Sequence, residues 1–574
     1  MGRLEDDNQE NLLLRRKVDA SQNQRFLAIS YTWDPSDNED NKCGAYWVES
    51  RSEGIYFPAL IRDCIIRRIA KYMRYCDLEL FWIDRHSLPQ KTCKTTDCRP
   101  MSTARELCVL KDIMNGELVT YDKANGSFRL MPMGSGVQRA REAIELLHAI
   151  TSDLWWQRAW TFQENYKAGK KMTLVISHSY ELEILKQSYG CFEGIPGELC
   201  IPSVDFSRQA TRLCQAFQGV EHKTSQDIMA VDKIRSTAGR YDVLLDETES
   251  MSPTVVADVE AREITDPWDR LPIVANCCDY PVRLDEYALK RGRHSLSLSI
   301  LTMCLLNGEV LHNRLHQPNQ LLPDVTVSQF LKTHCFNKIS APQDERRLTF
   351  NKSCRFRNAK LTWDGVRTKG HLWKLDRIIR TAEFNSHLPW VDYPKGSLTL
   401  EQHKYLTQLC LNLRWLRHNH LADELENYLR RDAANNAPYQ VGENYIYMMA
   451  AEVALAVKEG KTLRLACLWD PDGNWDPYRA IFICDEPTFT DSRDNRAFAF
   501  TSLQPKELGP DGYSINDTDR HVSLEVDMEI PNSPTGSSAP HLYVKRWLLG
   551  LCFFAGCELE KVVFPWPKAL AHSL

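Results

Sequence analysis

The chain reads Phe26-Leu27-Ala28-Ile29-Ser30-Tyr31-Thr32-Trp33 near its start, an apolar run that ends in hydroxyl groups and an indole. A second run, Leu78-Glu79-Leu80-Phe81-Trp82-Ile83-Asp84, ends in an acid. Both have the length and composition of buried strands. Between them, apolar residues recur at helical spacing at Leu60, Ile61, Cys64, Ile65, Ile69 and Met73. A strand, a helix and a second strand in this order predict a βαβ unit with parallel strands.

Polar side chains follow both predicted strands at their carboxyl ends. In open parallel α/β sheets, the ligand crevice lies outside these ends, because loops there can present side chains without disturbing the core. We therefore expect Ser30, Tyr31, Trp33 and Asp84 to converge at one edge of the sheet. A carboxylate from a later stretch, Glu164, is expected to join them.

This later stretch is Trp155-Trp156-Gln157-Arg158-Ala159-Trp160-Thr161-Phe162-Gln163-Glu164. Helical spacing from Val137 to Ile150 predicts a helix that leads into it. On one helix, Trp156, Trp160 and Glu164 would share a face, and the carboxylate would lie against an apolar wall that tunes its pKa. The alternative is structural: the tryptophans belong to the core, and Glu164 is a surface acid that pairs with Arg158.

Three ordered motifs resemble a known family. Ile29–Trp33, Trp82–Gln90 and Arg158–Glu164 closely resemble, in content and order, the heterokaryon incompatibility (HET) domain of fungal proteins. The resemblance covers roughly Arg25 to Tyr180, and Asp269–Cys278 resembles a downstream segment of long HET-containing proteins. It implies a protein of self/non-self recognition and programmed cell death.

HET domains are in turn similar to TIR domains, whose enzymatic members cleave NAD with a glutamate in a Trp-x-x-x-Glu context. Trp160 and Glu164 match that spacing. The resemblance implies an α/β N-terminal domain with a TIR-like, flavodoxin-like parallel sheet. It also implies NAD as the substrate, with no resident cofactor.

The resemblance assigns roles to the site residues. Glu164 would stabilise the positive charge that develops on the ribose as nicotinamide leaves. Trp33 and Trp160 would stack on a flat ring, and Ser30 and Tyr31 would hydrogen-bond the ligand. Asp84 belongs to the same substrate-binding group. Arg158 would meet a phosphate or pair with an acid, and we favour the structural role.

Two positions depart from the family pattern. Ser87 stands where the second motif usually has cysteine, so no thiol nucleophile is expected there. Asp34 stands where glycine often follows the tryptophan of the first motif.

The competing interpretation is a non-enzymatic module, in which exposed tryptophans and Arg158 anchor self-association through the N-terminal domain or bind a protein partner that triggers incompatibility.

Composition narrows the class of protein. Of the 574 residues, 43% are hydrophobic and 26% charged, as in ordinary multidomain globular chains. A net charge of -5 argues against nucleic-acid binding through a general basic field. The nineteen cysteines are scattered and no signal peptide is visible, so we expect reduced thiols and a cytoplasmic location. The longest apolar run, Trp547–Cys557, is a buried element too short to span a membrane.

The remaining patterns suggest a domain plan: a polar arm over 1–24, a HET domain over 25–190, a mainly helical region over 200–440, and an α+β region over 441–574 with a flexible insertion at 504–541. The range 25–190 is expected to fold alone. Asp470-Pro471-Asp472-Gly473 predicts a hairpin between 462–469 and 478–484.

Three local assignments complete the prediction. A helix over 102–115 is expected to begin with Ser102 as its N-cap. The range 253–269 resembles a connector, and no element is assigned to Leu118–Met131. Cys93 and Cys98 form one close pair without a partner pair, so no metal site is predicted.

Overall fold

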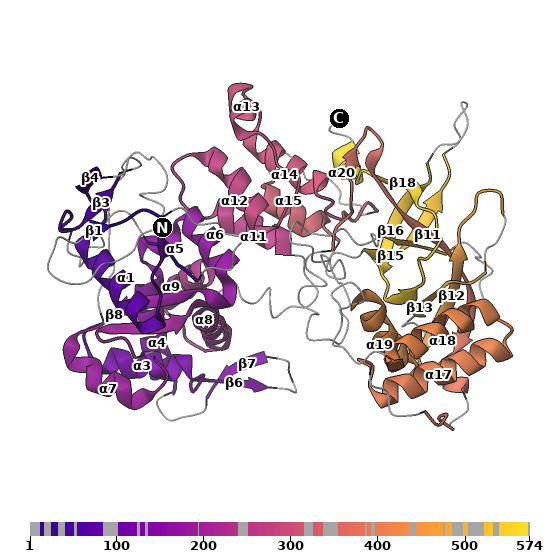
Figure 1. The fold of residues 1–574 in the computed structure, drawn as a ribbon, viewed down its shortest axis with the longest axis horizontal. Helices are drawn as coiled ribbons and strands as arrows, with labels where there is room; N and C mark the ends of the chain where they lie inside the picture. Colours follow the sequence, from indigo (N-terminus) through magenta and orange to yellow (C-terminus); the bar gives the residue numbers. More distant parts are fainter. Residues whose placement is uncertain are drawn as a thin grey trace. The chain divides into compact units, whose positions relative to one another are not determined.

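The computed structural model describes most of the chain as two compact units. The described residues are 12–16, 25–31, 41–50, 54–83, 101–122, 125, 127–131, 136–192, 194–238, 251–314, 325–336, 354–384, 387–391, 396–434, 444–473, 477–484, 497–502, 522–531 and 539–571. The first unit comprises 1–242 and 258–277, and the second comprises 243–257 and 278–574 (Figure 1). The chain is mixed α/β, with small sheets in the first unit and a larger sheet in the second.

The first unit alternates short strands and helices. In chain order its elements are β1 (Leu12–Leu13), β2 (Leu27–Ile29), β3 (Trp47–Glu49), β4 (Tyr56–Pro58), α1 (Asp63–Cys76), β5 (Phe81–Ile83), α3 (Ala104–Met114), β6 (Val119–Asp122), β7 (Ser127–Leu130), α4 (Gly136–Thr151), α5 (Leu154–Gln157), α6 (Ala159–Ala168), η1 (Gly169–Lys171), β8 (Thr173–Ser177), η2 (Tyr180–Leu182), α7 (Glu183–Tyr189), β9 (Glu198–Pro202), α8 (Ser203–Gln218), α9 (Ser225–Thr237), η3 (Pro267–Asp269) and α12 (Arg270–Cys277).

The predicted βαβ unit is confirmed. β2 and β5 pair in parallel, with Ala28 opposite Trp82, and α1 lies between them in sequence. α1 forms because its apolar stripe buries Ile65, Ile66, Ile69 and Met73, and it ends where Asp77 adopts a left-handed conformation. The antiparallel pair β3–β4 is inserted between β2 and α1. β1 pairs in parallel with β3 and buries Leu13, so this part of the predicted arm is docked.

Each described sheet of the first unit has two or three strands. The orders are β1-β3-β4, β2-β5, β6-β7 and β8-β9. β8 and β9 are antiparallel, and β6 with β7 forms a hairpin over the range left unassigned in the sequence. The strands of β2–β5 and of β8–β9 belong to separate sheets.

A shared core extends well beyond residue 190. β9 supplies Leu199 and Ile201, and α8 supplies Phe206 and Phe217, to the cluster that also holds Trp156. The predicted boundary near residue 190 therefore lies between β8 and its partner strand and divides this core.

We accordingly expect a fragment of residues 1–277 to fold and a fragment of 25–190 to fail. The shorter fragment lacks β9, α8 and α9, so it would expose the apolar surface that they cover. Urea unfolding followed by near-UV circular dichroism tests this: 1–277 should give one cooperative transition. A cooperative transition for 25–190 would show that the later helices are dispensable.

Two further predictions, one at α3 and one at 253–269, are wrong. Thr103, not Ser102, is the N-cap of α3, because its hydroxyl accepts the Glu106 amide while the Glu106 carboxylate accepts the Thr103 amide. The predicted connector contains a helix, α11 (Met251–Glu260), which buries Val255, Val256 and Val259.

The second unit is built on a nine-stranded sheet among its described residues. Its elements are α13 (Glu286–Arg291), α14 (Leu296–Leu306), α15 (Val327–His334), β10 (Lys360–Leu361), β11 (Gly365–Arg380), η5 (Thr381–Glu383), α17 (Leu400–Trp415), α18 (Asn419–Ala434), α19 (Asn444–Lys458), β12 (Thr462–Leu468), β13 (Ala480–Cys484), β14 (Phe498–Thr501), β15 (Ser523–Glu529), β16 (His541–Trp547), β17 (Gly550–Cys552), β18 (Glu560–Pro565) and α20 (Lys568–Ala571).

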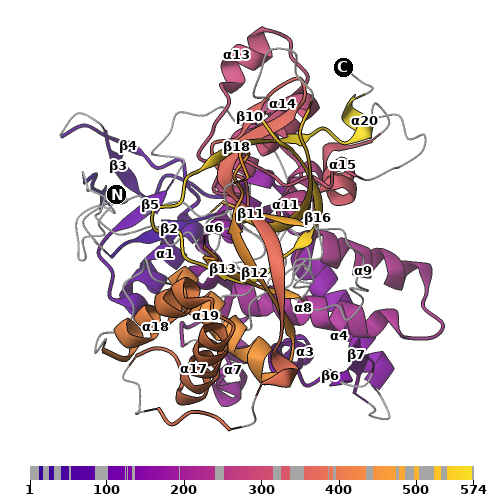
Figure 2. The ribbon, with the colours of Figure 1, turned by 90° about the vertical axis from the view of Figure 1, so that its right-hand side faces the viewer.

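The long strand β11 organises this sheet. It pairs with β12, β14 and β18, and the pairings through β14, β15, β16 and β18 return to β11 as a closed ring. Figure 2 shows β11 as the longest strand, with α17, α18 and α19 gathered at one end of the sheet. The predicted β12–β13 hairpin is confirmed. The region predicted as mainly helical also contains β11, which the sequence pattern did not reveal.

The predicted flexible insertion at 504–541 is interrupted by structure. β15 pairs with both β14 and β16, and its Leu524 and Val526 are fully buried. The prediction of one continuous insertion is therefore wrong at these residues. The segment 503–521 lies outside the described residues.

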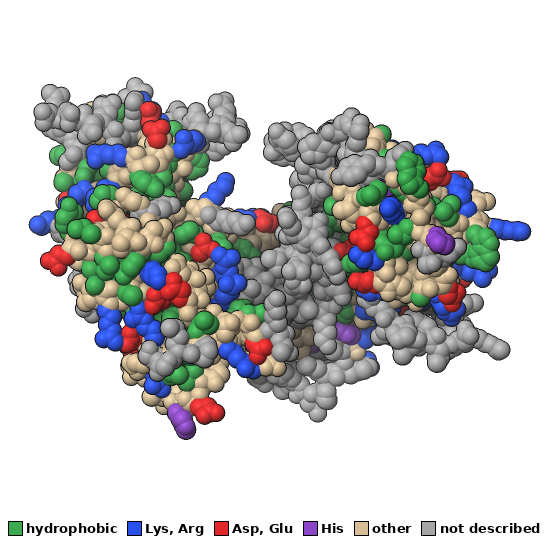
Figure 3. Space-filling model, turned by 90° about the horizontal axis from the view of Figure 1, so that it is seen from below, with side chains coloured by type: hydrophobic (Ala, Val, Ile, Leu, Met, Phe, Trp, Pro, Cys, Tyr) green, Lys and Arg blue, Asp and Glu red, His purple; other side chains and the backbone are tan. Residues whose placement is uncertain are grey.

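The described residues show the state of the cysteines, the grouping of possible metal ligands and the distribution of surface charge. All cysteines in the described ranges are free, and these ranges hold no group of three or more His, Cys, Asp and Glu side chains suited to a metal ion. Cys93 and Cys98 lie outside them. Among the described helices, none has the length and hydropathy needed to cross a bilayer. Basic and acidic side chains are interspersed on both units in the face shown in Figure 3.

His371 should make the stability of the second unit pH-dependent. Burial between Trp373 and Phe554 lowers its pKa from 6.5 to about 4. The unfolded chain therefore binds more protons between these values, so stability is complete above pH 6.5 and falls as the pH drops towards 4. The loss is at most about 1.4 kcal/mol per pH unit. The wild-type urea midpoint should be lower at pH 5 than at pH 7.5, and this difference should shrink in His371→Phe. The control His420→Gln changes an exposed histidine and should keep the wild-type difference. An unchanged difference in His371→Phe would contradict this.

Candidate functional site

The tryptophan-rich stretch is not one helix. α5 ends at Gln157, Arg158 is extended with φ -84° and ψ 139°, and α6 begins at Ala159. The prediction that Trp156 and Trp160 share a helix face is therefore wrong. Trp156 is 6% exposed and stacks on Phe206 with ring centroids 5.5 Å apart, so it belongs to the core.

A segment more than a hundred residues later fixes the break at Arg158. The backbone of Glu263 pairs beside it: the Ala159 amide donates to the Glu263 carbonyl at 3.1 Å, and the Glu263 amide donates to the Gln157 carbonyl at 2.9 Å. These bonds satisfy backbone groups that the interrupted helix leaves open. The backbone at Arg158 thus marks the junction between α5 and α6, and the acid partner predicted for its side chain stays a prediction.

The same later segment covers α6. The Trp160 indole donates to Asp269 Oδ2 at 3.3 Å, and the Asn276 amide donates to Gln163 Oε1 at 2.9 Å. Arg262 lies 4.3 Å from the centroid of the Phe162 ring. The range Asp269–Cys278, singled out in the sequence, therefore packs on the helix that carries Glu164.

Ser30 and Glu164 meet although 134 residues separate them. Ser30 Oγ donates a hydrogen bond to Glu164 Oε2. The Trp155 indole in turn donates to Ser30 Oγ at 2.7 Å, which directs the serine proton towards the carboxylate. The structure thus joins the end of β2 to α5 and α6 through one short chain of polar groups.

A cavity of about 370 Å³ opens beside this contact. Its described lining comes from β2 and the two residues after it, from α1 and its N-cap, from Met101 and α3, from the end of α4 with the α5 turn, and from the end of η1 with β8. The residues are Leu27, Ala28, Ile29, Ser30, Tyr31, Arg62, Ile65, Arg68, Ile69, Tyr72, Met101, Glu106, Leu146, Ala149, Ile150, Asp153, Trp155, Trp156, Lys171, Met172, Thr173, Leu174, Val175, Ile176 and Ser177. This volume suits a small organic ligand.

The predicted site residues divide into three groups. Ser30 and Tyr31 line the cavity, and Glu164 is joined to it through Ser30. The Trp160 indole bonds Asp269 and the backbone at Arg158 pairs with Glu263, and neither residue is part of the described lining. Trp33 and Asp84 lie outside the described residues.

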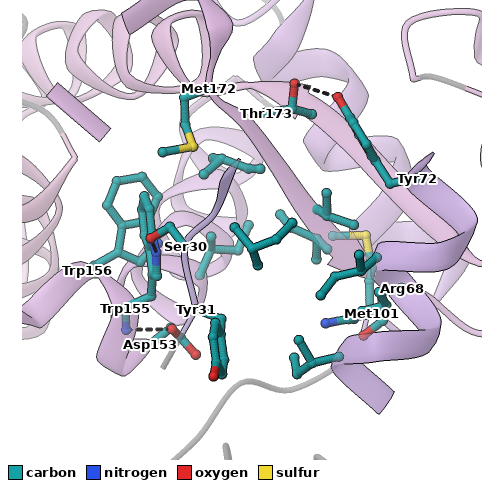
Figure 4. A pocket seen from close by; sticks show the side chains of 18 of the residues that line it. Ser30, Tyr31, Arg68, Tyr72, Met101, Asp153, Trp155, Trp156, Met172 and Thr173 are labelled. Atoms are coloured by element: carbon teal, nitrogen blue, oxygen red, sulfur yellow. Dashed lines mark hydrogen bonds between the residues drawn. The ribbon is translucent and has the colours of Figure 1, made fainter. Parts of the chain in front are cut away.

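Two walls of the cavity differ in chemistry. Figure 4 shows Trp155, Trp156 and Ser30 on one side and Arg68 with Tyr72 on the other. Tyr72 hydrogen-bonds Thr173 at 3.3 Å, which ties α1 to β8. Arg62 lies at the start of α1 and is only 1% exposed. The aromatic surface of the first wall suits a flat ring, whereas the second wall carries Arg62 and Arg68, of which Arg68 pairs with Glu198 at 3.0 Å.

Sequence reasoning did not identify the α1 residues of the cavity. Arg62, Arg68 and Tyr72 belong to an amphipathic helix that looked purely structural. The available signal was the position of two arginines within its apolar stripe, near Ile65 and Ile69.

Comparisons with protein-family models, with curated proteins and with solved structures return no match to this chain.

Proposed function

We propose that the chain is a HET-domain protein that hydrolyses the nicotinamide–ribose bond of NAD. The observation that carries this proposal is the hydrogen bond from Ser30 to Glu164 at the rim of the cavity. It unites a residue of the first motif with the glutamate of the third. A carboxylate beside a cavity that fits a small ligand is the arrangement that the reaction needs.

The chemistry requires charge stabilisation at the ribose. The bond from C1′ to the nicotinamide nitrogen breaks, its electron pair stays with nicotinamide, and positive charge develops on the sugar. Glu164 would stabilise this charge electrostatically. Water then adds to C1′ and releases one proton, which gives ADP-ribose and neutral nicotinamide. Ser30, held by Trp155, positions the carboxylate.

The proposal also includes a TIR-like sheet topology and a cellular role. The parallel pair β2–β5 with α1 would be the start of a TIR-like, flavodoxin-like sheet. The protein would act in the cytoplasm in self/non-self recognition, and self-association or a trigger protein would activate cell death.

A purely non-enzymatic interface receives less support from this geometry. Trp155 and Trp160 donate their indole protons within the first unit, and Trp156 is buried. Trp156 is therefore not available as an exposed interface anchor, and Trp155 and Trp160 are only partly exposed.

The test is release of nicotinamide from NAD by purified full-length protein, followed by chromatography. The assay includes conditions that promote association, such as high protein concentration. Nicotinamide and ADP-ribose should appear in equal amounts. Absence of both from folded, associated protein, together with cell toxicity at unchanged NAD, would refute the enzymatic proposal.

A further inference from the structure

We infer that Arg355 of the second unit holds α6 in place through the chain segment 258–277, so that the second unit controls the position of Glu164. This inference takes the role of Glu164 from the proposed function. The segment 258–277, called the holding segment below, belongs to the first unit, whereas 243–257 and 278–574 belong to the second. The chain therefore enters the first unit at residue 258 and leaves it after residue 277.

The holding segment supports α6 along its length. The backbone of Glu263 pairs at the start of α6, and Asp269 and Asn276 bond side chains further along it. The partner of Asn276 is Gln163, which directly precedes Glu164. A movement of the holding segment would therefore disturb the bonds that place α6 and its glutamate.

One side chain bonds both ends of the holding segment. Arg355 Nη2 donates to Ser252 Oγ at 2.9 Å, and Nη1 donates to the Cys278 carbonyl at 2.8 Å. Ser252 lies on α11, which leads into the segment, and Cys278 is the first residue after it. Glu309 aligns the guanidinium, since its Oε1 accepts Arg355 Nε at 2.7 Å and also accepts the Ser252 hydroxyl. One planar group thus fixes where the chain leaves the second unit and where it returns.

These bonds are shielded from water. Ser252, Cys278 and Glu309 are buried, and the Arg355 guanidinium carbon lies 4.8 Å from the centroid of the Tyr280 ring. Charge-assisted hydrogen bonds of this kind are stronger than neutral ones, and they gain strength away from water. The ends of the holding segment are therefore fixed by a buried network rather than by surface contacts.

α11 connects this network to α6. The helix spans Met251–Glu260, so it carries Ser252 in the second unit and Asp258 in the first. Arg262 donates to Asp258 Oδ1 at 3.2 Å and lies 4.3 Å from the centroid of the Phe162 ring of α6. Because a helix is a stiff connection, a displacement at Ser252 reaches the contacts of α6.

Arg355→Lys separates the holding role of this residue from its charge. Lysine keeps a positive charge beside Glu309, but its ammonium lacks the planar fork that reaches Ser252 and Cys278 together. Hydrogen–deuterium exchange of the full-length protein, followed by mass spectrometry, measures the consequence. Peptides from 159–168 and from the holding segment should exchange roughly 10-fold faster than in wild type, the effect of losing one charged hydrogen bond.

Reference peptides distinguish this local effect from general unfolding. Exchange in α3 of the first unit and in β12 of the second should stay at the wild-type rate. Arg367→Lys is the matched control, since Arg367 is exposed on β11, and it should leave every peptide unchanged. Ser252→Ala removes the bond at one end only and should give the same pattern with a smaller amplitude.

Two results would overturn the inference. The first is a wild-type exchange rate over 159–168 in folded Arg355→Lys, or in Ser252→Ala if the lysine variant does not fold. The second is an equal rise in α3, which would show a loss of stability in the whole first unit rather than of the support for α6.

Exchange also separates this inference from the proposed function, because it requires no catalysis. If the protein cleaves NAD, nicotinamide release by Arg355→Lys should fall together with the protection of α6. A protein that cleaves nothing but shows the expected exchange pattern refutes the enzymatic proposal and supports the holding role of Arg355. Undiminished release with wild-type exchange in Arg355→Lys overturns the holding role alone.

Discussion

Replacing Glu164 with glutamine is expected to lower the rate of NAD cleavage roughly 10²- to 10³-fold while the protein stays folded. Glutamine keeps the volume of the side chain, and its amide oxygen still accepts the proton of Ser30 Oγ. What disappears is the negative charge, which in the proposed reaction would stabilise the developing cation on the ribose. If the N-terminal domain instead acted by binding a partner through its tryptophans, the same substitution would leave that binding largely intact.

The measurement is kcat for nicotinamide release, with the urea midpoint recorded for each variant. Glu145→Gln is the control, since Glu145 is an exposed acid on α4 and loses the same charge away from the cavity. In cells, toxicity and NAD depletion should disappear together in Glu164→Gln at normal protein levels. Toxicity that persists with unchanged NAD would contradict the enzymatic role of Glu164.

The sequence predicted the parts of the fold that depend on local patterns. The β2–α1–β5 unit follows from two apolar runs and one helical stripe, and the β12–β13 hairpin follows from the turn residues around Gly473. Ser30 and Glu164 were expected to converge, and they do. Each of these features is encoded within a short stretch or in the order of such stretches.

The missed features depend on contacts between distant residues. No glycine or proline in the sequence marks the break at Arg158. The backbone of Glu263, a residue far along the chain, pairs beside Arg158 at this break. Helical spacing places Arg62 on the apolar stripe and Arg67 off it, but it does not reveal that a cavity lies beside Arg62. β11 was missed because the consecutive buried residues Gly370–Trp373 interrupt its alternation and because most of its partner strands follow far along the chain.

The second large effect concerns stability: Arg355→Met should destabilise the second unit by about 3–5 kcal/mol. The guanidinium donates to Glu309 Oε1 at 2.7 Å, to Ser252 Oγ at 2.9 Å and to the Cys278 carbonyl at 2.8 Å. The side chains of Arg355 and Glu309 are 11% and 3% exposed. Removing the cation leaves the Glu309 charge buried with only the hydroxyls of Ser252 and Tyr280 among these partners.

Urea unfolding at pH 7 measures this loss. The double variant Glu309→Met with Arg355→Met should be more stable than Arg355→Met alone, because it removes the uncompensated charge along with its partner. Arg367→Met, on an exposed position of β11, should leave the midpoint within about 0.5 kcal/mol of wild type. A small effect of Arg355→Met, or no recovery in the double variant, would show that the network adds little.

The covering of α6 by a later segment also sets an order of events during synthesis. Gln163 and its partner Asn276 are 113 residues apart. A ribosome that adds roughly 5–20 residues per second needs about 6–23 s to make that stretch. During this interval a nascent chain carries all three motifs, yet its α6 lacks the bonds to Glu263, Asp269 and Asn276. A chain that ends before Glu263 would contain Glu164 on an α6 that lacks these contacts to the later segment.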